Sequence, residues 1–127
     1  MQFSWSVRNA QLDVLDGLAL MLELRTGEAP TDCRSKDSGL LLGSVQLPVD
    51  WLWPSVGGIK TKVDNWESVK ILLTGKVGHF RMKDTECRMQ GSVSGKGGDG
   101  DMELDNVNVA EGQMVVVENF KLTAGNP

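Results

Sequence analysis

The sequence contains no tyrosine, a single histidine and only two cysteines among its 127 residues. With His79 alone, the chain cannot build a histidine-rich metal site or the histidine-based relay that nucleophilic enzymes use. Cys33 and Cys87 lie far apart and match no zinc-binding spacing, so we expect them to be thiols in a reducing compartment. These shortages argue against an enzyme and lead us to expect no cofactor and no metal.

Basic residues are outnumbered by acidic ones, 13 against 17, and the chain has no long apolar run. The formal net charge is -4, and no basic stripe interleaved with aromatic residues is present, so we expect no binding to nucleic acid. The apolar stretch 18–24 is interrupted by Glu23, so we expect no membrane span. The first five residues lack the basic and apolar regions of a signal peptide. We therefore expect the protein to be made in the cytoplasm and not to be exported.

What the chain does contain is glycine, with 15 residues, and short segments in which apolar and polar residues alternate. This period of two is typical of half-buried antiparallel strands, and the glycine-rich breaks between segments are typical of turns. The pattern predicts about eight strands, which fall within residues 18–25, 40–47, 59–63, 68–73, 76–83, 87–93, 102–104 and 114–122. Since apolar residues crowd both faces of 114–117, we expect an all-β fold of two packed antiparallel sheets or a closed barrel.

The N-terminal part differs from the remainder of this single domain, which spans residues 1–127. Asn9 is placed to cap a short helix over 10–16, which Gly17 would end. Before it, Phe3 and Trp5 share one face of an extended arm over residues 1–8. We expect this arm either to dock on another chain or to close the edge of its own sheet.

Four alternating carboxylates, at Asp99, Asp101, Glu103 and Asp105, suggest a possible calcium site. An EF-hand loop starting at Asp99 fails, because Leu104 stands where glycine is needed and Ala110 where glutamate is needed. A solvated strand surface explains the carboxylates better. The preceding glycines resemble a phosphate loop only superficially, and we expect a hairpin connection there.

Three tryptophans, Trp51, Trp53 and Trp66, lie in or near one loop region beside prolines. They could stack on sugars, anchor a protein interface or fill the end of the core. Core filling is the better expectation for any single one, but we expect at least one to lie at a protein contact. The candidate interface residues are therefore Phe3, Trp5, Trp51 and Trp53.

Several short motifs, taken as a set, carry a resemblance to known proteins. They occupy residues 8–13, 24–27 with Ala29, Pro30 and Cys33, then 78–81, 89–91, 98–102 and 122–126. In these motifs the chain resembles the capsid cement, or decoration, proteins of short-tailed phages of the Bordetella phage type. The Trp- and Pro-bearing segment 49–56 departs from the family pattern.

The resemblance implies a jelly-roll-like β sandwich that binds the outer surface of a shell of major capsid protein and stabilises it. It further implies a location on the virion exterior and self-association, with a dimer favoured over a trimer. The alternative is an accessory β module of the phage tail that binds a host glycan through the tryptophans. Copy number per virion distinguishes these two hypotheses.

Overall fold

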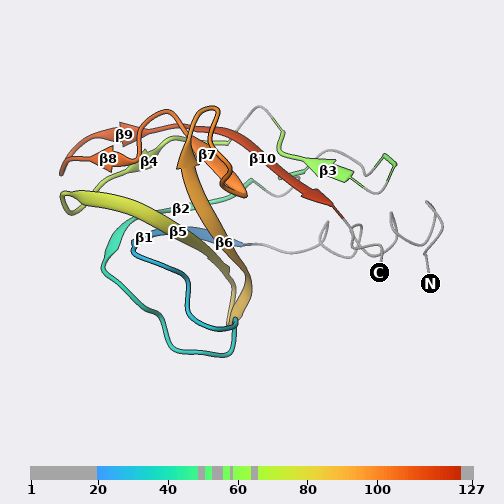
Figure 1. The fold of residues 1–127 in the computed structure, drawn as a ribbon, viewed down its shortest axis with the longest axis horizontal. Coiled ribbons are helices and arrows are strands. Elements are labelled where there is room, and N and C mark those ends of the chain that lie inside the picture. The colour runs from blue at the N-terminus through green and yellow to red at the C-terminus, as the bar shows by residue number, and fades with distance from the viewer. Residues whose placement is uncertain (1–19, 49–50, 53–55, 58, 64–65, 124–127) are drawn as a thin grey trace.

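The computed structural model describes residues 20–48, 51–52, 56–57, 59–63 and 66–123, and this part of the chain is all-β, as predicted (Figure 1). Its ten strands are β1 (Met21–Thr26), β2 (Leu41–Gln46), β3 (Ile59–Thr61), β4 (Val69–Lys70), β5 (Gly75–Lys83), β6 (Cys87–Gly95), β7 (Met102–Leu104), β8 (Asn108–Val109), β9 (Met114–Val115) and β10 (Val117–Thr123). No helix occurs within these residues. The expected helix over 10–16, the arm over 1–8 with Phe3 and Trp5, and Trp53 lie outside the described residues.

The strands form one curled sheet and a small two-stranded sheet. The main sheet has the order β2-β1-β5-β6-β7-β10-β3, and β8 pairs with the beginning of β5. The small sheet consists of β4 and β9, and a bridge between Gly43 and Ile71 joins it to β2. In Figure 1, β1, β2 and β5 lie along one side of the core, while β4, β7, β9 and β10 lie along the other.

The pair β6–β7 is parallel, whereas every other pair of named strands is antiparallel. The expectation of a simple hairpin connection after Gly95 is therefore wrong. The chain reverses twice between these strands, and Gly97 allows this with a φ of 85°. Ser94 then fixes the second reversal by accepting a hydrogen bond from the Gly100 amide at 3.0 Å.

The core fills the space enclosed by the curled sheet. Phe80 on β5 meets Phe120 on β10 edge to face, with ring centroids 5.6 Å apart. Around this pair lie side chains that are at least nine-tenths buried, from β1, β5, β7, β9 and β10: Leu22, Leu24, Met82, Met102, Leu104, Val115 and Val117. Burial of this apolar area is the main favourable contribution to folding.

The segment 114–117 alternates more strictly than its composition suggested. Val115 and Val117 are buried, but Met114 and Val116 are exposed. The expectation that both faces of this segment are covered is therefore wrong: the face of Val115 packs on the core, but within the described residues no second layer covers the face of Met114 and Val116.

Candidate functional site

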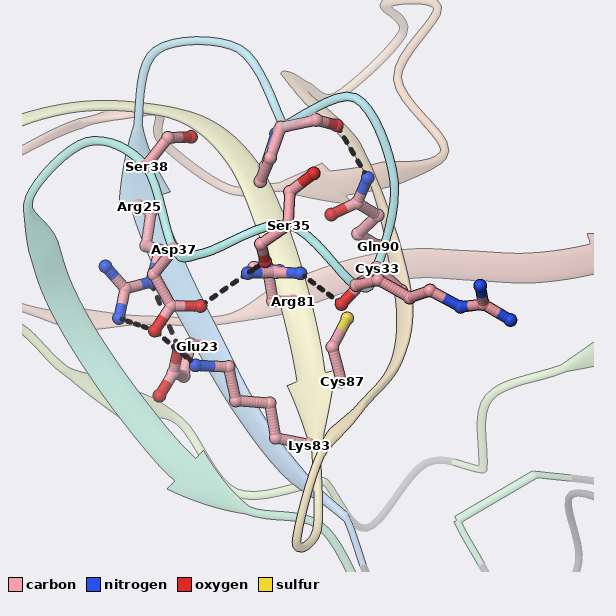
Figure 2. Close-up of polar contacts among 12 residues, drawn as sticks. Glu23, Arg25, Cys33, Ser35, Asp37, Ser38, Arg81, Lys83, Cys87 and Gln90 are labelled. Atoms are coloured by element: carbon pink, nitrogen blue, oxygen red, sulfur yellow. Dashed lines mark hydrogen bonds and ion pairs between the residues drawn. The ribbon is translucent and has the colours of Figure 1, made fainter.

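Three adjacent strands carry polar side chains on the face opposite the core, and residues 27–40 cross over this face (Figure 2). The register places Arg81 on β5 directly between Glu23 on β1 and Gln90 on β6. Two residues further along β5, Lys83 lies opposite Cys87. Because the loop covers this face of β5, the side chains of His79 and Arg81 are only 0% and 1% exposed. The middle of β5 is therefore buried on both faces.

Backbone carbonyls of the loop are held by these strand side chains. The Gly27 carbonyl is 2.9 Å from His79 Nδ1, which places the donating hydrogen on that nitrogen. Gln90 Nε2 donates to the Pro30 carbonyl at 2.8 Å, and Arg81 Nη2 donates to the Cys33 carbonyl at 2.9 Å. The loop therefore has a defined path across β5 and β6.

Asp37 is the charged anchor of the loop. Its carboxylate accepts hydrogen bonds from Arg81 Nη1 at 2.5 Å, from Lys83 Nζ at 2.5 Å and from Arg25 Nη2 at 3.1 Å (Figure 2). The hydrogen bond from Lys83, followed by that from Arg81, lowers the pKa of Asp37 below its ordinary value, although burial opposes this. Burial disfavours the charge on Arg81, but Asp37 and Cys87 outweigh it and raise the Arg81 pKa.

The two cysteines meet at this site although they are distant in sequence. Both line an open depression of about 840 Å³ together with Ser35, Asp37 and Arg81. Burial, followed by the neighbouring Cys87 side chain, raises the pKa of Cys33 to about 11, while Arg81 opposes the shift. Both residues are free thiols and half-buried.

A strict period of two along β6 would place Cys87 on the same face as Met89, but the structure places it on the other face. A bulge between Met82 and Lys83 shifts the register, so that Cys87 faces Lys83. Cys87 therefore lies beside Arg81 as well. No sequence signal marks a bulge at this turn.

Of the described tryptophans, Trp51 lies in the core and Trp66 packs against it, partly buried. Trp51 is 1% exposed, with its ring centroid 6.0 Å from that of Trp66 and 6.3 Å from that of Phe120. Trp66 Nε1 donates to the Trp51 carbonyl at 2.6 Å, and Lys62 lies over the Trp66 ring. Trp51 thus fills the core within this chain, which is one of the roles expected for it.

The carboxylates of 99–105 lie near the β6–β7 connection, and two of them bind backbone amides. Asp101 accepts a hydrogen bond from the Ser92 amide at 3.1 Å, and Asp105 accepts one from the Val116 amide at 3.1 Å. Across the part of the chain that the structure describes, no group of three or more His, Cys, Asp or Glu side chains is placed to hold a metal ion. The two hydrogen-bonded carboxylates therefore have structural partners.

Comparisons with models of known protein families, with curated proteins and with solved structures give no match. Among the described residues, no helix has the length and apolar character that a bilayer crossing requires.

Proposed function

We propose that this protein is a cement protein of a tailed-phage head, which binds the outer surface of the major capsid protein shell and strengthens it without catalysing a reaction. The role is supported by the resemblance of sequence motifs, spread from residue 8 to residue 126, to those of phage decoration proteins. In this proposal the curled all-β fold is a jelly-roll-like sandwich, and the protein pairs with itself on the virion.

The observation that carries the proposal is an apolar surface at the small sheet. Leu72, Leu73, Met114 and Val116 lie on or beside β4 and β9, and each is between 42% and 53% exposed. The β4–β9 register puts Met114 opposite Lys70, so Met114 and Leu72 are diagonal neighbours on the outer side. Adjacent exposed apolar side chains are typical of protein interfaces, and we assign this surface to the capsid shell.

The charge of the chain suits the exterior of a head. With a formal net charge of -4, the protein would be repelled by packaged DNA if it lined the interior. A protein that binds only the assembled shell shifts the assembly equilibrium toward that shell by mass action. Many copies multiply this effect even when each contact is modest.

The alternative of a glycan-binding tail module has less support. Such a module needs an aromatic face that is open to sugars, but Trp51 is buried and Trp66 is partly covered by Lys62. The described tryptophans therefore supply no open stacking platform.

The test is the copy number of the chain in purified virions and isolated heads, measured by quantitative mass spectrometry against the major capsid protein. We expect a near-integer ratio to the capsid protein and retention in tail-free heads. A few copies per virion, lost with the tail, would support the tail module instead. Absence from virions would refute both roles.

A further inference from the structure

The Cys33 and Cys87 thiols share one depression, although one lies in the loop 27–40 and the other at the beginning of β6. Each backbone is positioned by the same strand, β5. Arg81 holds the Cys33 carbonyl at 2.9 Å, and Lys83, two residues further on, is the register partner of Cys87. In Figure 2 the sulfur of Cys87 points toward Cys33.

The fold restricts both segments in this arrangement. Asp37 fixes the loop through three cations, while Cys87 is fixed by the β5–β6 ladder and by a 3.5 Å contact between its sulfur and the Met89 carbonyl. Two thiols held on such anchors have a high effective concentration toward each other, compared with a thiol in solution. The depression is open, so a small reagent can reach them.

We propose that Cys33 and Cys87 are a modification site at which a small-molecule disulfide, of the glutathione type, converts the two thiols into an intramolecular disulfide. This inference does not depend on the proposed function. One thiolate attacks the small disulfide, which forms a mixed disulfide and releases the first small thiol. The second thiolate attacks the protein sulfur of that mixed disulfide, forms the Cys33–Cys87 bond and releases the second small thiol.

The balance is two protein thiols and one small disulfide giving one protein disulfide and two small thiols. Each protein thiol loses its proton, and each departing small thiolate takes one up. Cys33, with its pKa raised to about 11, remains protonated near neutral pH and reacts slowly there. The glutathione poise of a reducing cytoplasm keeps the pair as a dithiol, whereas an oxidising medium closes it. Because the thiolate is the attacking species, we expect closure to be faster as the pH rises.

Closure would tie the loop covalently to β6, in addition to the hydrogen bonds and ion pairs that hold it now. A bond between positions so distant in sequence restricts the unfolded chain strongly. For a domain of this size we expect oxidation to raise the melting temperature by roughly 5–15 °C. Reduction should reverse the change.

The experiment incubates the purified full-length protein with oxidised and reduced glutathione, followed by acid quenching, thiol alkylation and intact-mass measurement. We expect a monomer with no free thiol and no glutathione adduct. Cys33→Ser and Cys87→Ser should each retain one glutathione adduct, and neither should show the rise in melting temperature. In urea, the ratio of intramolecular disulfide to glutathione adduct in the wild-type protein should fall by about tenfold or more, because the unfolded chain no longer holds the two thiols together.

Two free thiols, glutathione adducts at both positions, or disulfide-linked dimers in the wild-type protein would overturn the proposal. Circular dichroism of each serine variant checks that it is folded. If either fails this check, Cys33→Ala or Cys87→Ala, which leaves no unpaired hydroxyl, takes its place. Peptide mapping of the oxidised wild-type protein independently decides whether the Cys33–Cys87 linkage exists.

Discussion

At the scale of single residues, the least predictable feature is a charged side chain in the interior. The alternation along β5 predicts that Phe80 and Met82 face the core and that Arg81 faces water. The structure covers that face with residues 27–40, so that Arg81 is 1% exposed. The sequence could not predict this cover, because the partner, Asp37, is 44 positions away and nothing local marks the pair.

Asp37→Asn should destabilise the protein by about 2 kcal/mol, because it leaves Arg81 buried without a counter-charge; the loss is moderated by the partial exposure of Asp37. Since the folded-state pKa of Asp37 is lowered, its contribution is present above pH 4 and is lost as the pH falls below that value. Urea unfolding at pH 7 and pH 3 measures both effects. The difference between wild type and variant should shrink at pH 3.

Asp84→Asn is the matched control, because Asp84 also pairs with an arginine, Arg88, but at an exposed turn. We expect it to change the unfolding midpoint far less than Asp37→Asn does. Equal effects of the two substitutions would show that the Asp37 cluster contributes no more than a surface ion pair.

At the scale of elements, the sequence predicted the strands better than their connections. Strands β1, β2 and β5 fall where alternating apolar residues placed them, since burial of one face leaves a direct imprint on the sequence. The β6 bulge and the parallel β6–β7 pair were missed, because each depends on long-range register and not on local pattern. One shifted residue moved Cys87 to the opposite face and made the cysteine pair invisible from the sequence.

The approach of the loop to β5 gives an element-scale prediction at Gly78. A Cβ at this position would overlap the backbone of Gly27, which cannot move without displacing the beginning of the loop. Gly78→Ala should therefore lower the free energy of unfolding by about 1–3 kcal/mol. Gly95→Ala is the control, because a Cβ there meets no atom within 4 Å. A Gly78→Ala protein as stable as Gly95→Ala, in urea unfolding, would contradict this close approach.

At the scale of the whole molecule, the covered polar face and the apolar surface beside β4 and β9 belong to different parts of the fold. The first is built by β1, β5 and β6 under the loop, and the second by the small sheet at the outside of the curl. The alternating pattern predicted an all-β scaffold and the net charge an acidic surface, but neither indicated which face stays apolar. That depends on the tertiary arrangement, in which one face of the small sheet packs on the core and the face that carries Met114 and Val116 stays exposed.

The surface beside β4 and β9 yields the last prediction. Met114→Lys places a charge on it while leaving the buried neighbour Val115 in place, so the melting temperature should change little. If this surface binds the capsid shell, desolvating the new ammonium should weaken binding to isolated heads by about tenfold or more. Val56→Lys is the matched control, since Val56 is 76% exposed and lies next to β3, which Figure 1 shows at the opposite end of the molecule from β9. Co-sedimentation with heads that lack the protein measures both variants. Normal binding by Met114→Lys together with weak binding by Val56→Lys would move the contact to the β3 end of the sheet.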